Sequence, residues 1–196
     1  TMLGTITGAT TVCSGTNATT LTLGGSTGSI QWQSSSDNIS FTTIGSATTS
    51  TYSATNLTAT TYYRVIVTSG VCAADTSSSS TMAVSPISVA GSISGASTVC
   101  SGTNSTLLTL SGNTGTIQWQ SSSDNSVFSN IGSATNSTYT ASNLTTTTYY
   151  RAVITSGVCS SDTTASVTVT VSPVSVAGTI TGATTVCTGT NSTTLT

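Results

Sequence analysis

The sequence predicts an all-β fold: an extended tandem array of immunoglobulin-like β-sandwiches with about seven strands each. Three observations support this prediction. Apolar and polar residues alternate over short stretches, which is typical of strands with one buried face. Thr, Val, Ile and Tyr, which favour strands, are common in these stretches, and turn-forming Gly, Asn and Asp separate them. The chain also repeats itself at the length of one small sandwich domain.

The repeat has a period of 87 residues. Segment 4–13 recurs at 91–100 with Thr-to-Ser exchanges and again, unchanged, at 178–187, and both offsets are 87 residues (91 − 4 and 178 − 91). The chain therefore divides into repeat 1 (1–90), repeat 2 (91–177) and the N-terminal part of a truncated third repeat (178–196). Because the third copy stops within an expected strand, we expect the sequence to be an excerpt from a longer array.

Each repeat shows the pattern of about seven short strands. In repeat 1 we place them at 5–7, 19–23, 29–33, 41–44, 51–57, 61–68 and 82–84. Segments 85–91 and 172–178 join successive repeats, and their Pro, Val and Ala residues make them too apolar for flexible linkers. The sequence therefore predicts a semi-rigid rod.

The stretch Ile-Gln-Trp-Gln-Ser-Ser-Ser-Asp-Asn occurs twice, at 30–38 and 117–125, and holds the only tryptophan of each repeat. Its alternation predicts a strand that buries Trp32 and turns Gln31 and Gln33 toward solvent. We expect the polar residues that follow to form a turn capped by the Asp carboxylate. The predicted core residues are Trp32, Trp119, Tyr63, Tyr150, Leu21 and Leu23.

The scarcity of charge excludes several classes of function. The chain has two basic and four acidic side chains, and it contains no His, Lys or Glu. Two arginines cannot follow a nucleic-acid backbone, and no apolar run approaches the length of a membrane span. No Ser can be activated as a nucleophile without His or Lys, and no carboxylate pair suits glycoside hydrolysis. We therefore predict that this protein is not an enzyme and takes no cofactor or metal.

The five cysteines predict disulfide bonds and an oxidising, extracellular setting, because no Cys-x-x-Cys pair or histidine suggests a zinc site. The sequence leaves two pairings open. The first is internal to each repeat, Cys13–Cys72 and Cys100–Cys159, and leaves Cys187 without its partner.

The second pairing follows from sandwich topology. The turns that carry Cys13 and Cys72 lie at opposite poles of an immunoglobulin-like sandwich, whereas a disulfide needs Cα atoms within roughly 7 Å. In a head-to-tail chain one pole faces the opposite pole of the next repeat. Cys13 then bonds to Cys159, and Cys100 reaches into the third repeat.

The motifs T-V-C-S-G-T, I-Q-W-Q-S-S-S-D, T-T-Y-Y-R and T-S-G-V-C, at the spacing found here, resemble the immunoglobulin-like repeats of secreted Bacteroidota surface proteins. They are most similar to the giant mobile adhesins of gliding flavobacteria, and the resemblance covers the whole chain. It implies type IX secretion, an outer-membrane-associated cell-surface location, and a role in attachment and gliding motility. The sequence departs from the antibody pattern, because its cysteines flank the second and sixth strands instead of lying on them.

The resemblance also implies partners and a modification. Other parts of the protein are expected to contact the envelope motility and secretion machinery and an extracellular surface or polysaccharide. The sequence Asp162-Thr163-Thr164 fits the Asp-Thr/Ser O-glycosylation pattern that comes with the resemblance, which makes Thr163 a candidate site.

Together these observations predict a stalk or spacer segment of a secreted filamentous adhesin, in which each repeat contacts mainly its neighbours. Two alternatives stay open. The repeats could be carbohydrate- or ligand-binding modules multiplied for avidity, which glycan binding would support. They could also form a self-assembling extracellular fibre through exposed strand edges, which concentration-dependent assembly would support.

Overall fold

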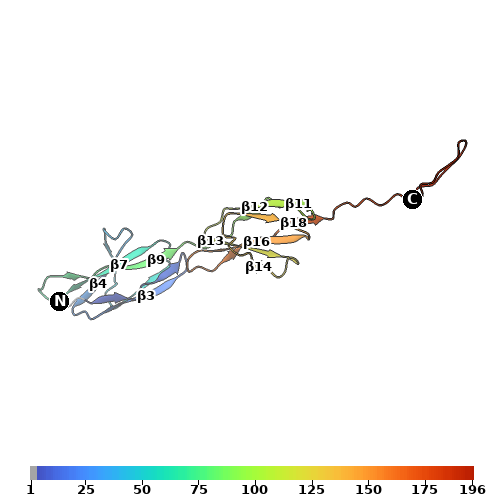
Figure 1. Cartoon of the computed structure of the whole chain (residues 1–196). Helices are drawn as coiled ribbons and strands as arrows, with labels where there is room; N and C mark the ends of the chain where they lie inside the picture. The colour runs from blue at the N-terminus through green and yellow to red at the C-terminus, as the bar shows by residue number, and fades with distance from the viewer. Residues whose placement is uncertain (1–3) are drawn as a thin grey trace.

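The computed structural model describes residues 4–196. It contains two β-sandwiches, one for each repeat, which lie end to end and are followed by an extended C-terminal segment (Figure 1). The predicted all-β architecture of tandem immunoglobulin-like sandwiches is confirmed. Residues 173–196, which include the expected third copy, contain no assigned strand.

Within residues 4–196, each repeat has nine strand segments, more than the seven expected. Those of repeat 1 are β1 (Thr5–Thr7), β2 (Thr11–Cys13), β3 (Ala18–Gly24), β4 (Ser29–Ser35), β5 (Thr42–Thr43), β6 (Thr51–Thr55), β7 (Thr61–Thr68), β8 (Asp75–Thr76) and β9 (Ser80–Ser85). Those of repeat 2 are β10 (Ser92–Ser94), β11 (Thr98–Cys100), β12 (Ser105–Ser111), β13 (Thr116–Ser122), β14 (Ser129–Asn130), β15 (Thr138–Ser142), β16 (Thr148–Thr155), β17 (Asp162–Thr163) and β18 (Val167–Ser172).

Two sheets face each other in each repeat. In repeat 1 the strand orders are β1-β3-β6 and β2-β9-β7-β4-β5, with β8 paired to β7. Repeat 2 has the same topology, with β10-β12-β15 facing β11-β18-β16-β13-β14 and β17 paired to β16.

The first strand of each repeat is divided between the two sheets. In repeat 1, β1 pairs antiparallel with β3, whereas β2 pairs parallel with β9. Gly8 lies between them with a φ of 91°, and a side chain there would collide with the Thr20 carbonyl. The crossing from one sheet to the other therefore depends on glycine. The sequence pattern predicts β1 but not the three-residue β2.

A buried tryptophan occupies the centre of each sandwich. Trp32 is fully buried and lies opposite Val65 of β7, and its Nε1 donates a hydrogen bond to the Thr49 carbonyl at 2.9 Å. The polar edge of the indole is therefore satisfied within the core. Trp119 is equally buried and donates to the Asn136 carbonyl at 2.9 Å. All six core residues named from the sequence are at most 4% exposed: Leu21, Leu23, Trp32, Tyr63, Trp119 and Tyr150.

The expectation of two solvent-facing glutamines is wrong. Gln33 is only 9% exposed, and its Oε1 accepts a hydrogen bond from Arg64 Nε at 2.8 Å. Gln31 is half-buried, and its Nε2 donates to the Ile44 carbonyl at 2.7 Å. The Arg64 guanidinium in turn lies 4.0 Å from the centroid of the Phe41 ring. Gln33 and Arg64 therefore form a polar layer on the outer face of β4, and the loop that contains Phe41 covers this layer.

A carboxylate caps the turn that follows β4. Asp37 Oδ1 accepts hydrogen bonds from the backbone N–H groups of Ile39 and Ser40 and from the Ser35 hydroxyl, all at 2.8 Å. The backbone bonds from Ile39 and Ser40, followed by the Ser35 hydroxyl, lower the pKa of Asp37 to about 2. Asp124 makes the equivalent bonds in repeat 2, and they lower its pKa to about 2 as well.

Because charged carboxylates cap these turns, we expect the protein to lose stability in acid. The folded-state pKa lies below the ordinary value of 3.8, so the caps stabilise the fold fully above that value and lose their effect as the pH falls toward 2. We expect the urea midpoint, followed by tryptophan fluorescence, to be level between about pH 7 and 5 and to fall between about pH 4 and 2.

The matched variant is Asp37→Asn with Asp124→Asn, which keeps an acceptor oxygen but no charge. Its urea midpoint is expected to fall much less over the same pH range. An equally steep fall in both proteins would show that other groups cause the acid sensitivity.

Candidate functional site at the junction of the repeats

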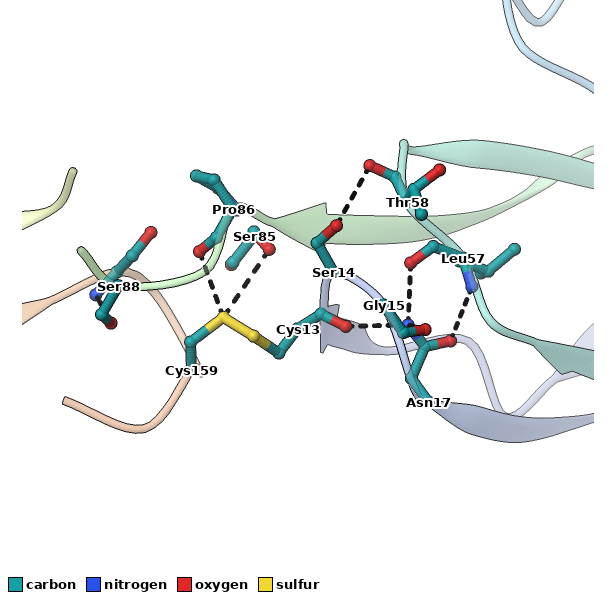
Figure 2. The surroundings of a disulfide bond; sticks show 11 residues. Cys13, Ser14, Gly15, Asn17, Leu57, Thr58, Ser85, Pro86, Ser88 and Cys159 are labelled. Carbon is teal, nitrogen blue, oxygen red and sulfur yellow. Dashed lines mark hydrogen bonds between the residues drawn. A yellow bond between two sulfur atoms is a disulfide. The ribbon is translucent and has the colours of Figure 1, made fainter. Parts of the chain in front are cut away.

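Cys13 lies at the pole of repeat 1 that faces repeat 2. It ends β2 in register with Ser85, the last residue of β9, and the Ser14 N–H donates to the Ser85 carbonyl at 2.9 Å. Asn17 holds the turn, because its Nδ2 donates to the carbonyls of Cys13 and Leu57 at 2.7 and 2.8 Å. Figure 2 shows the bonds of Asn17 to Cys13 and Leu57 beside the disulfide.

Cys159 lies at the facing pole of repeat 2, in the turn that follows β16. Its N–H donates to the Ser156 carbonyl at 2.9 Å, which closes the turn. The two cysteines form a disulfide bond with an S–S distance of 2.01 Å and a Cα–Cα distance of 5.0 Å (Figure 2). Cys159 is buried, and its sulfur lies 3.1 Å from the Pro86 carbonyl oxygen. The bond therefore joins repeat 1 to repeat 2 beside the start of the connecting segment.

The internal pairing of Cys13 with Cys72 and of Cys100 with Cys159 is not formed. Cys72, Cys100 and Cys187 are unpaired and exposed in the described part of the chain, 4–196. Cys72 follows the end of the eight-residue β7, whereas Cys13 lies near its start, because β9 runs antiparallel to β7. Eight residues of strand span about 26 Å, far more than the roughly 7 Å that a disulfide allows between Cα atoms.

Loop entropy does not choose between the two pairings. The internal bond closes 59 residues (72 − 13), and the bond between repeats closes 146. In the chain-entropy model these loops contribute about 4 and about 5 kcal/mol to the free energy of unfolding. This difference is small compared with the cost of distorting a sandwich to bring its poles together. Geometry therefore decides the pairing.

The connecting segment 86–90 is bound to repeat 2. Val89 and Thr114 form an antiparallel bridge in which Thr114 N–H donates to the Val89 carbonyl at 2.9 Å and the reciprocal bond is 3.2 Å. Ala90 is 7% exposed and belongs to the core of repeat 2. The segment is therefore structured and not a free linker, in agreement with its apolar composition.

The turn of Cys159 packs closely against the connecting segment. The Ser156 N–H donates to the Ser88 hydroxyl at 3.0 Å. Gly157 has a φ of 53°, and a side chain there would collide with Ser85. The equivalent Gly70 in repeat 1 has a φ of 55° but open space around it. Gly157 is therefore needed both for the turn and for close approach of the two repeats.

Asp162 binds the connecting segment, a role that the sequence analysis did not assign. Its Oδ2 accepts a hydrogen bond from the Ala90 N–H at 2.9 Å, while its Oδ1 accepts one from the Thr163 N–H at 2.9 Å. The equivalent Asp75 makes only the local bond, to Thr76 N–H at 2.9 Å. The sequence signal for this role is one isolated carboxylate at the same position of each repeat in a chain nearly free of charge.

Thr163, the candidate O-glycosylation residue, lies exposed on β17. Its neighbour Thr164 is buried, and the Thr164 hydroxyl accepts a hydrogen bond from the Ala152 N–H at 3.0 Å. Of the two hydroxyl groups, only that of Thr163 is accessible for modification.

The pole of repeat 2 that carries Cys100 has the same local structure as the Cys13 pole of repeat 1, but its cysteine is unpaired. Cys100 ends β11 in register with Ser172, and the Ser101 N–H donates to the Ser172 carbonyl at 2.8 Å. Asn104 Nδ2 donates to the Cys100 and Leu144 carbonyls, both at 2.7 Å. Repeat 1 likewise has the other half of the junction, since the Cys72 N–H donates to the Ser69 carbonyl at 3.0 Å.

Residues 4–196 contain no cluster of metal-ligating side chains and no ligand-sized pocket. In the same residues there is no helix long and apolar enough to span a membrane.

A family model matches the sequence twice, at residues 2–86 and 89–173, with a boundary inside the connecting segment. The family is described as a domain of unknown function, DUF8696. The chain belongs to the DUF8696 family. Each DUF8696 domain corresponds to one sandwich, so the disulfide joins two members of the family in tandem. No curated protein matches this sequence.

Solved structures resemble the two DUF8696 domains in fold. A chain from the complex of a mouse coronavirus receptor-binding domain with its murine receptor is 16% identical, with a TM-score of 0.58 and coverage of 85% of this chain and 98% of that one. A marsupial T cell receptor chain is 11% identical, with a TM-score of 0.57 and coverage of 92% and 77%. A titin segment is 14% identical, with a TM-score of 0.50 and coverage of 84% and 62%. At these identities the similarity establishes the immunoglobulin-like fold alone.

Tryptic digestion can identify the disulfide. The chain has no Lys, so trypsin cleaves after Arg64 and Arg151 and yields the fragments 1–64, 65–151 and 152–196. After free thiols are alkylated, mass spectrometry without reduction is expected to find 1–64 joined to 152–196. A bond internal to repeat 1 would instead join 1–64 to 65–151.

The control is Cys187→Ser, because Cys187 lies on the same fragment as Cys159. The joined fragments are expected to persist in this variant and to disappear in Cys159→Ser. Loss of the joined fragments in Cys187→Ser would contradict the Cys13–Cys159 bond.

Removal of the Asp162 carboxylate is expected to loosen the connecting segment. Asp162→Ala leaves the Ala90 N–H without its acceptor, and a hydrogen bond of this kind contributes about 1 kcal/mol. We therefore expect the hydrogen-exchange protection of the Ala90 amide to fall about fivefold. Asp75→Ala, the matched change in repeat 1, is expected to leave that amide unaffected. An equal loss of protection at the Ala90 amide in both variants would contradict the role of Asp162 at the junction.

Proposed function

We propose that this chain is a spacer segment in the stalk of a secreted, filamentous cell-surface adhesin. The main support for the proposal is the disulfide bond between successive repeats, because it adds a second covalent link between two domains that are otherwise joined only by the connecting segment. A structural disulfide of this kind persists in an oxidising compartment, which supports an extracellular location. The resemblance to Bacteroidota surface adhesins supports an outer-membrane-associated position and use in attachment and gliding motility.

The near-identity of the repeats supports a mechanical role over a unique binding role. Repeats 1 and 2 share their strand order, their buried tryptophan and their capped turn. In a spacer the length increases with the number of copies, and each copy contacts mainly its neighbours. Attachment to a surface or polysaccharide, and contact with the secretion and motility machinery, are then tasks for other parts of the protein.

The same proposal assigns no catalysis to this segment. With no His, Lys or Glu in the sequence, a hydroxyl nucleophile has no neighbouring base to activate it. The surface is rich in Ser and Thr, roughly 45% of the chain, and glycans at positions such as Thr163 would keep a charge-poor stalk soluble.

Small-angle X-ray scattering and a glycan array together test the stalk function. The sample is the chain with the unpaired cysteines Cys72, Cys100 and Cys187 changed to Ser. For a spacer we expect an elongated particle whose maximum dimension does not change with concentration, and no binding on the array. Reduction of the remaining bond is expected to broaden the distance distribution, because only the connecting segment then joins the repeats.

Two results would argue against a stalk. Saturable binding to a defined glycan, lost on mutation of one pole, would support a carbohydrate-binding module. Growth of the particle with concentration would support a self-assembling fibre.

The variant Gly157→Ala disturbs the junction without reduction of the disulfide, so it is measured beside the reduced sample. Gly70→Ala is its control, because it applies the same backbone strain away from the junction.

A further inference from the structure

The disulfide bond changes which residues carry a force applied between the two ends of the chain. Cys13 and Cys159 are 146 positions apart in sequence, yet their Cα atoms are 5.0 Å apart. A force applied at the N-terminal and C-terminal ends therefore has a covalent route that omits residues 14–158. The omitted stretch includes Trp32 and Trp119 and most of both hydrophobic cores.

We propose that the Cys13–Cys159 bond is a mechanical bypass that carries tension past the cores of both repeats. Under tension the cores then have no force drawing them apart, and both repeats stay folded while the chain is pulled. This inference rests on the proposed stalk function for its biological use, since a segment that is never under tension has no need of a bypass.

Within the two repeats, two segments remain on the loaded route, 4–13 and 159–172, and the C-terminal segment 173–196 follows them. The first contains β1 and β2, and the second contains β17 and β18. Residues in a strand already rise about 3.3 Å each, close to the maximum of roughly 3.6 Å for a fully extended chain. The strands of the loaded segments therefore have little length to release, and only the short turns between these strands can extend before covalent bonds carry the load.

The strands beside the loaded segments support them from the side. β2 pairs with β9, and β18 pairs with both β11 and β16. The force pulls on the two ends of each loaded segment. The strands paired with that segment lie beside it and do not transmit the force. The sandwiches thus keep the loaded strands in place and protect them, while the tension passes along the strands themselves.

The bypass also relieves the non-covalent part of the junction. The connecting segment 86–90 lies within the omitted stretch, together with the bridge of Val89 to Thr114. The hydrogen bond from Ala90 to Asp162 joins this segment laterally to the loaded segment 159–172. Without the disulfide, these weak contacts would lie directly on the route of the force. With it, they set the orientation of the two repeats and carry no tension.

Single-molecule stretching of the full chain tests the bypass. Handles are attached at both ends, and Cys72, Cys100 and Cys187 are changed to Ser so that no other disulfide can form. The oxidised molecule is expected to show no extension step as large as a repeat. In dithiothreitol the same molecule is expected to unfold in two steps and to gain roughly 500 Å, which is 146 residues at about 3.4 Å each.

The variant Cys13→Ser with Cys159→Ser is the control, and it is expected to release the same length with or without reductant. If that variant does not fold, its contour length at high force is still roughly 500 Å greater than that of the oxidised parent. An oxidised parent that releases the full length would overturn the bypass.

The outcomes for the bypass and for the stalk are separable. A chain that binds a glycan but releases no length when oxidised retains the bypass and loses the stalk function. An inert, elongated chain that releases the full length when oxidised retains the stalk function and loses the bypass.

Discussion

The parallel pairing of β2 with β9 is the constraint on which the junction depends. It places Cys13 beside Ser85, where the chain leaves repeat 1, so the cysteine and the connecting segment emerge at the same point. The turn of Cys159 can therefore contact both at once, through the disulfide and through the hydrogen bond from Ser156 to Ser88. If β2 stayed in the first sheet with β1, the sulfur would lie on the wrong side of the sandwich.

Much of the fold could be predicted from the sequence, because the repeated alternation of apolar residues reports directly on burial. This alternation predicts burial of Trp32, Tyr63 and the leucines of segment 19–23, and all of these side chains are buried. The short β2 was missed, because three residues are too few to show a period. The polar layer of Gln33 and Arg64 was also missed, since alternation alone cannot show that a distant loop covers the outer face.

The junction was only partly accessible to sequence analysis. The distance between the poles of a sandwich follows from the length of its strands. This distance is too long for a disulfide within one repeat, so the sequence already suggested the bond between Cys13 and Cys159 as an alternative to the internal pairing. The roles of Asp162 and Gly157 could not be derived, because both depend on how the connecting segment folds back onto repeat 2. Residues equivalent to them in repeat 1, Asp75 and Gly70, make no such contacts.

Each repeat carries one half of the junction at each pole, Cys72 and Cys100 being the copies that are unpaired in residues 4–196. Such a contact joins two different surfaces and does not close on itself, in contrast to a twofold interface. Whole copies of 87 residues can therefore be inserted or deleted by recombination between the near-identical segments, and every remaining junction still receives its matching partner. The length of the array can change in evolution without any adjustment of its joints.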